Sequence, residues 1–266
     1  MVTTGTSDPF KLLNIANDGA VAIVTLANPP VNALSPALVD DISRTLDHIE
    51  RDTAVRAVVL TGGTTRFFSA GADVATFVKH THQQNVDYIR KGSALWDRLE
   101  SYPKAVVAHV NGFAFGGGAE LALACDVRVF AESARFGLPE VNLGILPGWG
   151  GMQRLSNLIG RGRALEICLS GRQIDAKEAL AVGVAIATAP DAEAGAKAVA
   201  IAKQLAEKSP LAVREIKRRI ADGAGKPLSE SQPKDIEAFF RLIASQDAKE
   251  GLTAFLEKRA PKFTGK

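Results

Sequence analysis

The chain has 266 residues, which is enough for one large domain or for one domain with an appendage. Hydrophobic residues make up 46 % and charged residues 23 % of it, a composition that excludes a largely disordered protein. The net charge is only +3, and no dense basic stripe carries interleaved aromatic residues, so the composition argues against a nucleic-acid-binding protein.

The first part of the chain predicts two strands, a helix and a third strand. Residues 10–15 and 21–26 have the composition of strands, and residues 17–19 read Asn-Asp-Gly, a turn signal between them. Ser35, directly before a proline, predicts the start of a helix. A short buried strand is expected over residues 57–60, after which the chain reaches a glycine pair.

The middle of the chain repeats this alternation. Helices and strands are expected, in order, over residues 91–99 (helix), 105–110 (strand), 119–124 (helix), 127–130 (strand) and 160–169 (helix, closed by Gly171). The recurrence indicates stacked β-β-α units, although no sequence repeat has a fixed period. We therefore predict an α/β core over residues 1–190.

From residue 191 onward the pattern is helical throughout, which predicts a helical C-terminal region over residues 191–266. Ser209 and Pro210 start one of these helices, and Asp247 is expected to cap the last one. The region is too thin to bury its own apolar positions. We expect some of them to pack on the core or on another subunit, namely Leu252, Phe255 and Leu256.

Two loops rich in small residues stand out. The first ends in Ser69-Ala70-Gly71-Ala72-Asp73, where small side chains let the backbone approach a ligand and Asp73 can accept from N–H groups of its own turn. In the second, Gly116, Gly117 and Gly118 open a helix whose N–H groups and dipole point at the site. One backbone donor from each loop would make an oxyanion hole.

Two glutamates accompany these loops. Glu120 follows the glycine run, and Glu140 lies in a separate loop that begins at Phe136 and is followed by Gly144-Ile-Leu-Pro-Gly-Trp-Gly-Gly151. A lone glutamate is usually a solvated surface residue. Two of them beside a backbone oxyanion hole have the form of an acid/base pair.

Together these segments resemble the crotonase (enoyl-CoA hydratase/isomerase) superfamily. The resemblance extends through Gly150-Gly-Met-Gln-Arg154 and residues 250–259, and it covers the chain from about Phe10 to Phe263. It implies a spiral of β-β-α units with a C-terminal helical region that forms trimers, often paired into hexamers. One departure is Leu138, where hydratases commonly have glutamine.

The resemblance also implies roles for single residues. The backbone N–H groups of Ala72 and Gly117 would hold the thioester oxygen, and Glu120 and Glu140 would flank the substrate double bond. The substrate and CoA contacts that it implies are Arg66, Ser69, Ala70, Gly71, Asp73, Gly116, Pro139, Gly148, Phe255 and Lys258. Lys258 would reach in from a neighbouring subunit, and Phe255 and Phe263 would pack near the adenine.

Both glutamates match the pattern of an enoyl-CoA hydratase, in which Glu120 activates water and Glu140 in its acid form protonates C2. The alternatives that stay open are an enoyl-CoA isomerase, another CoA-thioester lyase or hydrolase of the superfamily, and a non-catalytic CoA-thioester-binding or RNA-binding relative. A serine hydrolase is disfavoured because Gly-x-Ser-x-Gly is missing. The loop expected over residues 74–88, with Trp149, would shape the acyl pocket.

We expect no cofactor beyond the coenzyme A of the substrate, and no metal, since His80 and His82 lack an evident third ligand. The partners expected are an acyl-CoA thioester and further copies of the chain, as a homotrimer or homohexamer, with no nucleic acid and no membrane. Cys125 and Cys168 lie in apolar segments and predict free thiols. With no signal segment at the start, the expectation is a cytoplasmic protein.

Overall fold

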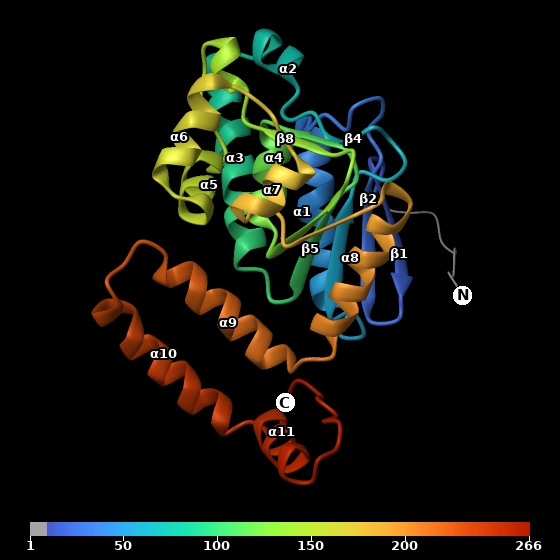
Figure 1. Cartoon of the computed structure of the whole chain (residues 1–266), viewed down its shortest axis with the longest axis vertical. Helices are drawn as coiled ribbons and strands as arrows, with labels where there is room; N and C mark the ends of the chain where they lie inside the picture. Colours follow the sequence, from blue (N-terminus) through green and yellow to red (C-terminus); the bar gives the residue numbers. More distant parts are fainter. Residues whose placement is uncertain (1–9) are drawn as a thin grey trace.

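The computed structural model describes residues 10–266 and contains two β-sheets flanked by helices (Figure 1). The larger sheet has the strand order β1-β2-β3-β5-β7-β10. Its strands are β1 (Leu13–Asp18), β2 (Val21–Leu26), β3 (Ala57–Thr61), β5 (Ala105–Val110), β7 (Val127–Ala131) and β10 (Ala187–Ala189). The hairpin β1–β2 is antiparallel and the remaining neighbours are parallel. The predicted first strand therefore begins and ends later than expected, because Asn17 and Asp18 continue the ladder.

The smaller sheet has the order β4-β6-β8-β9 and was not anticipated. Its strands are β4 (Phe67–Ser69), β6 (Phe113–Phe115), β8 (Arg135–Gly137) and β9 (Ile174–Asp175). They have two or three residues each, too few to give a strand pattern in the sequence. Because β4, β6 and β8 follow β3, β5 and β7 directly, each turn of the chain passes from the larger sheet to the smaller one. This confirms the predicted spiral of β-β-α units.

The two faces of the larger sheet are covered by different helices. Alternate residues point to opposite faces of a strand, so Val58 and Leu60 join the cluster that includes α1 (Pro36–Arg51) and α3 (His82–Glu100). Ala57 and Val59 join the other cluster, beneath α8 (Asp191–Ala206). An alanine stripe lets α8 lie close to the sheet; it consists of Ala194, Ala198, Ala202 and Ala206.

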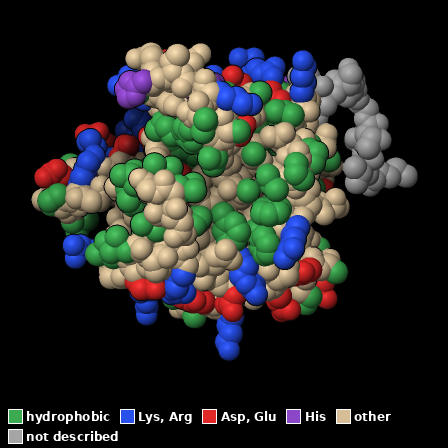
Figure 2. All heavy atoms as spheres, turned by 90° about the horizontal axis from the view of Figure 1, so that it is seen from above, with side chains coloured by type: hydrophobic (Ala, Val, Ile, Leu, Met, Phe, Trp, Pro, Cys, Tyr) green, Lys and Arg blue, Asp and Glu red, His purple; other side chains and the backbone are tan. Residues whose placement is uncertain are grey.

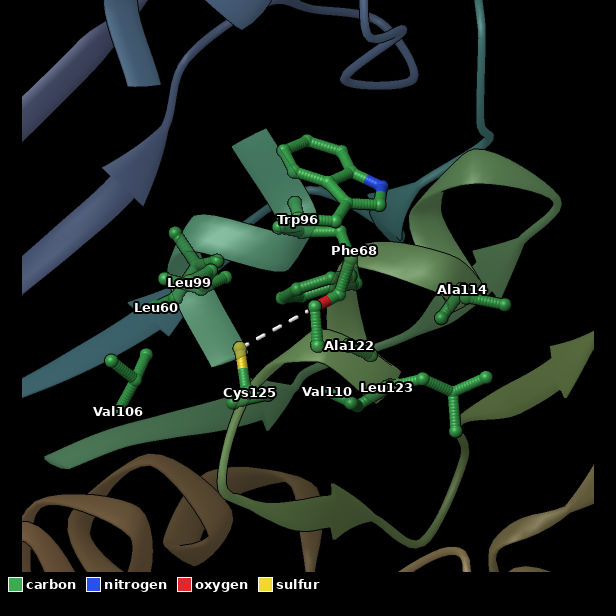
Figure 3. Packing of buried hydrophobic residues seen from close by; sticks show 14 of the residues in the cluster. Leu60, Phe68, Trp96, Leu99, Val106, Val110, Ala114, Ala122, Leu123 and Cys125 are labelled. Atoms are coloured by element: carbon green, nitrogen blue, oxygen red, sulfur yellow. Dashed lines mark hydrogen bonds between the residues drawn. The ribbon is translucent and has the colours of Figure 1, made fainter. Parts of the chain in front are cut away.

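Helix α4 (Gly117–Ala124) is buried along its whole length. It begins at Gly117, two residues before the predicted start. Figure 3 shows Ala122 and Leu123 of this helix among Phe68, Trp96 and the strand residues of the core. A helix buried on every side has little freedom to shift, so the groups at its N-terminus are rigidly placed.

The remaining core helices are α2 (Val74–Lys79), the 3₁₀ helix η1 (Glu140–Leu143), α5 (Gly151–Ile159), α6 (Arg161–Ser170) and α7 (Ala176–Val182). The prediction of a loop over residues 74–88 is wrong, because α2 and the first turns of α3 occupy it. Thr81 caps α3 through a reciprocal capping box with Gln84. That signal starts the helix nine residues before the predicted position 91.

Three helices extend from the core at its lower end in Figure 1: α9 (Pro210–Gly223), α10 (Leu228–Ile243) and α11 (Gln246–Leu256). Helix α8 packs on the sheet, so by packing the C-terminal unit begins at α9 rather than at residue 191. The cap of α11 is Ser245, not Asp247. The Asp247 carboxylate instead accepts from the Ser209 hydroxyl and from the backbone N–H groups of Thr264 and Gly265.

Part of the C-terminal unit presents apolar side chains to the outside of the single chain. Leu252, Phe255 and Leu256 are 55, 82 and 80 % exposed, so they do not pack on the core. Large exposed apolar residues also lie on α9 and α10, among them Ile216, Ile220, Ile236, Phe239 and Phe240. Of the two expected partners for Leu252, Phe255 and Leu256, the core is thus excluded, and burial against another subunit stays a prediction.

Cys125 is buried and Cys168 is half-buried, and both thiols are free, as predicted. Within residues 10–266 no helix is long and apolar enough to cross a membrane. The same residues contain no group of three or more His, Cys, Asp or Glu side chains placed to hold a metal ion.

Candidate active site

Three neighbouring parallel strands of the smaller sheet deliver the candidate residues. β4 leads into Ala72, β6 leads into Gly117 and Glu120, and β8 leads into Glu140. Since β4 pairs with β6 and β6 with β8, both in parallel, their carboxyl ends meet at one edge. Residues separated by almost 70 positions in the sequence therefore come together.

The backbone nitrogens of Ala72 and Gly117 lie close to one another. A Cβ atom placed at Gly117 would be 3.2 Å from the Ala72 nitrogen and 2.4 Å from the Trp149 ring, so only glycine fits there. In the described part of the chain neither N–H group donates to a protein acceptor. Two adjacent free donors at the start of a helix suit an oxygen that becomes negative.

The loop that carries Ala72 is held from below by Asn32, which sequence analysis missed. Asn32 is fully buried, and its amide donates to the carbonyls of Gly62, Phe67 and Phe68. The Ser69 hydroxyl donates to the Asn32 carbonyl at 2.7 Å and accepts from the Gly71 N–H. Asn32 has a φ of 51°, which asparagine tolerates better than most residues, but no sequence pattern marks this position.

The Ser69 side chain is completely buried in the protein, so its hydroxyl supports the loop. A substrate contact of Ser69 stays a prediction. Ala70 and Gly71 also tie the loop to the chain near Asn32, through Ala70 N–H to the Val31 carbonyl and Leu34 N–H to the Gly71 carbonyl.

Asp73 is the N-cap of α2. Its carboxylate accepts from the Ala75 N–H at 3.1 Å and from the Thr76 hydroxyl at 3.0 Å, as predicted for a group that rigidifies its own turn. Both oxygens are thus engaged with α2, and the side chain is a structural cap rather than a free anion at the site.

Glu120 lies in the first turn of α4 and is 1 % exposed. Its Oε1 accepts from the Trp149 N–H and the Gly151 N–H, both at 2.8 Å. Burial raises the pKa of this carboxyl, while the two N–H groups and the nearby Arg154 oppose the rise. The two N–H groups fix the direction of the carboxylate.

Glu140 begins η1 and is half-buried. A Cβ atom at Gly116 would be 3.1 Å from Glu140 Oε1, so the two loops touch at this point. The other oxygen, Oε2, is buried without a hydrogen-bond partner in the described residues. Burial first, and the charge of Glu120 second, raise the pKa of Glu140 to about 7.

Two carboxyl groups with raised pKa values lie here beside two free backbone donors. A glutamate with a pKa near neutrality can hold a proton at working pH and still release it. Because a negative charge on one glutamate disfavours a negative charge on the other, the state with one proton on the pair is favoured. Such a site can accept a proton from one reactant and donate one to another.

Trp149, which was predicted to help shape the acyl pocket, is buried behind the loops of the site. It is 1 % exposed and packs edge-to-face against Tyr88 and Trp96. Its ring lies directly against Gly117. The tryptophan is therefore the rigid wall behind one of the two donors.

The other predicted contact residues spread over a wider area. Arg66 is exposed, and its guanidinium lies 4.6 Å from the centre of the Phe113 ring. Pro139 directly precedes Glu140, and Gly148 faces Ile89. Phe255 and Lys258 lie in and just after α11, at the end of the molecule opposite α2 (Figure 1). Within one chain they do not join the site.

The end of the molecule that carries α2 is seen face-on in Figure 2. Hydrophobic side chains gather in the middle of this face, and charged side chains of both signs, Lys and Arg among them, stand around its margin. Exposed apolar residues of α2 and of the η1 segment include Val74, Val78, Leu143 and Leu146. An apolar centre with Lys and Arg side chains within its margin suits a ligand with an apolar part and an anionic part.

Comparison with known proteins agrees with this geometry. The sequence profile of the enoyl-CoA hydratase/isomerase family matches residues 16–266. A probable enoyl-CoA hydratase of Bacillus subtilis is 42 % identical over 258 residues, which cover 96 % of this chain and all of the relative. The short-chain-enoyl-CoA hydratase of Clostridium acetobutylicum is 37 % identical over 92 % of this chain and 94 % of its own length.

Solved structures show the same fold. The enoyl-CoA hydratase of Bacillus anthracis superposes with a TM-score of 0.92 at 36 % identity, and the match covers 96 % of this chain and 100 % of the other. With the family profile spanning nearly the whole sequence, the chain belongs to the enoyl-CoA hydratase/isomerase family.

Proposed function

We propose that the protein is an enoyl-CoA hydratase that adds water across the double bond of a 2-enoyl-CoA and forms a 3-hydroxyacyl-CoA. The observation that carries this proposal is the juxtaposition of Glu120 and Glu140 with the free N–H groups of Ala72 and Gly117. Two relatives named as hydratases, 42 and 37 % identical to this chain over more than nine-tenths of its length, support the proposal.

The two N–H groups act on the thioester carbonyl. Attack of water at C3 moves electrons onto the carbonyl oxygen and forms an enolate. Two fixed donors stabilise that charge without reorganising, and loss of one such donor typically costs about 10²–10³ in rate. Burial of α4 and the Trp149 wall hold the Gly117 donor in place.

The two glutamates carry the protons. The Glu120 carboxylate takes a proton from water as its oxygen bonds to C3. The acid form of Glu140 gives a proton to C2 as the enolate collapses to the thioester. One H and one OH are added in all, and transfer of the proton from Glu120 to Glu140, directly or through solvent, resets the pair. This chemistry uses the coenzyme A of the substrate and needs no other cofactor.

We further propose that a neighbouring subunit completes the coenzyme A site, in a homotrimer or a homohexamer. Leu252, Phe255 and Leu256 form an exposed apolar surface on α11 that association would cover. In such an assembly Lys258 would reach the phosphates bound by Arg66 of the adjacent chain. Lys and Arg side chains stand among the charged groups at the margin of the apolar face in Figure 2, and a phosphate contact needs cations of this kind.

The test is a panel of 2-enoyl-CoA thioesters of rising chain length, followed by loss of the conjugated absorbance. In labelled water the product should carry solvent oxygen at C3 and solvent hydrogen at C2. If the protein converts 3-enoyl-CoA much faster than it hydrates 2-enoyl-CoA, it is an isomerase and the proposal is wrong.

A further inference from the structure

The proposed mechanism gives no role to Arg154, although it is the most extensively hydrogen-bonded side chain of the Gly150-Gly-Met-Gln-Arg154 segment. It lies on α5 and is 10 % exposed, although it carries a charge. Its Nη1 donates to the Trp149 carbonyl at 2.7 Å. Its other nitrogens bind two carboxylates of α3, Asp97 at 2.6 Å and Glu100 at 3.1–3.2 Å.

Trp149 connects this arginine to the site. Its C=O accepts from Arg154, and its N–H donates to Glu120 Oε1. The second donor to Oε1, the Gly151 N–H, comes from the first residue of the helix that carries Arg154. The turn over residues 149–151 therefore lies between Glu120 and Arg154.

We propose that Arg154 is a positioning residue for Glu120: it fastens the turn over residues 149–151 to α3 and so fixes the two N–H groups that hold the carboxylate. The inference rests on the proposed function. Gly150, the N-cap of α5, has a φ of 87° and offers no side chain to cap the helix, so no capping side chain holds this turn.

Arg154 also bears on the charge of Glu120. The charged and titratable groups around Glu120 are Glu140 on η1, Cys168 on α6 and Arg154 on α5, with Asp97 and Glu100 behind the arginine on α3. Of these, Arg154 is the cation that lowers the pKa of Glu120. Loss of the Arg154 charge should therefore raise the pKa of Glu120. Because the proposed mechanism needs Glu120 as a carboxylate, the acid limb of the pH profile, where activity falls as the pH is lowered, should move to higher pH.

The experiment compares Arg154→Met and Arg154→Lys with Arg98→Met as the matched control. Arg98 lies on α3 and also joins two carboxylates, Asp47 and Glu50, and a backbone carbonyl, that of Ser43, but it does not touch the turn. The readouts are kcat, KM and the pH profile for hydration of crotonyl-CoA, with melting temperature as a check on folding.

We expect Arg154→Met to lower kcat at least about tenfold, since small misplacements of a reacting group are costly, with KM changed far less. Its acid limb should move to higher pH. Arg154→Lys keeps the positive charge, so its acid limb should lie where that of wild type lies. Its kcat should recover only in part, because lysine cannot make all the hydrogen bonds of arginine. Arg98→Met should stay within about twofold of wild type, as exposed ion pairs contribute little.

If Arg154→Met matches Arg98→Met in kcat and in acid limb, the inference is wrong. If Arg154→Met does not fold, Glu100→Gln decides, because it weakens the clamp but keeps the charge of Arg154. Loss of the Glu100 charge leaves the charge of Arg154 less compensated, so the pKa of Glu120 should fall and the acid limb should move to lower pH. If neither the acid limb nor kcat changes, Arg154 does not position Glu120. A wild type that hydrates no 2-enoyl-CoA would sink the proposed function, and the inference with it.

Discussion

Glu140 Oε1 lies against the backbone of Gly116, at the point where a Cβ atom would stand only 3.1 Å away. Gly116 directly precedes Gly117, so the carboxyl group of Glu140 is one residue from an unpartnered backbone donor. In the proposed reaction the proton from Glu140 goes to C2 and the Gly117 N–H binds the carbonyl oxygen, two atoms that share C1 as a neighbour. The contact between Glu140 and Gly116 places both groups within reach of one thioester.

Replacement of either glutamate by glutamine should lower kcat for crotonyl-CoA hydration by at least about 10², the low end of what one acid/base group contributes. Glutamine keeps the size of the side chain, so folding should survive. The double variant should fall far short of the product of the single effects, because both groups act on one transition state. Near-wild-type hydration by Glu120→Gln, measured in steady state, would rule out the two-carboxylate mechanism.

Gly117→Ala should lower kcat by about 10²–10³, because a Cβ atom there displaces the donor that stabilises the enolate. That atom would lie 2.4 Å from the Trp149 ring, so the ring or α4 must move. Gly162→Ala is the matched control, since it also adds a methyl group at a helical glycine but meets no atom within 4 Å. It should leave kcat unchanged. Equal kcat values for the two variants would exclude the Gly117 donor.

Stability should depend on pH through Glu140. The folded protein holds its proton up to a pKa of about 7, above the ordinary value of 4.5, so folding stability falls as pH rises between these values and remains low above them. Glu140→Gln removes that loss. At about pH 8 the variant should be more stable than wild type by on the order of 1–2 kcal/mol after allowance for solvent screening. Urea unfolding at both ends of the range tests this, and a gain confined to acid pH would contradict it.

Arg66→Ala and Lys258→Ala should each raise KM for a CoA thioester about tenfold, the size expected for a lost contact with a charged group. KM for the matching pantetheine thioester, which lacks the nucleotide phosphates, should barely change. Lys177→Ala serves as a control because Lys177 is an exposed lysine on α7 outside the proposed site. Equal losses on both thioesters would refute the phosphate contact.

Phe255→Asp should dissociate the assembly. Phe255 is 82 % exposed in the single chain, and a charge placed in a covered apolar surface opposes association. Light scattering should report the 28.1 kDa chain for this variant and a multiple of three for wild type. Val78→Asp is the control, as Val78 is 85 % exposed at the opposite end of the molecule. A monomeric wild type at working concentration contradicts the proposal.

The sequence predicted five of the six strands of the larger sheet and missed β10, which has only three residues. Strand β3 is almost entirely apolar, and β5 and β7 are apolar except for His109 and Arg128. The sequence also indicated the loops that carry Ala72, Gly117 and Glu140. The smaller sheet escaped notice since its strands are too short for a period of two to appear. Two helix starts were predicted wrongly. The capping box of Thr81 and Gln84 was overlooked, so α3 begins earlier than predicted. Asp247 was expected to cap α11, but its carboxylate binds Ser209, Thr264 and Gly265 instead.

Supporting residues were harder to predict than the site itself. Asn32 acts through carbonyls 30 to 36 positions away, and Arg154 through contacts with α3 at 54 and 57 positions away. Neither has a local pattern that distinguishes it from a loop asparagine or a surface arginine. Their roles depend on which chain segments meet in space, and that information belongs to the fold.

The stacking of β4, β6 and β8 divides the chemistry among consecutive coils of the spiral. One coil supplies the Ala72 donor, the next supplies the Gly117 donor and Glu120, and the third supplies Glu140. Under the proposed function, a substitution of Glu140 in the third coil removes a proton-transferring group and leaves both oxygen-binding donors in place. The two parts of the proposed chemistry are thus built by separate segments of the chain and can change independently.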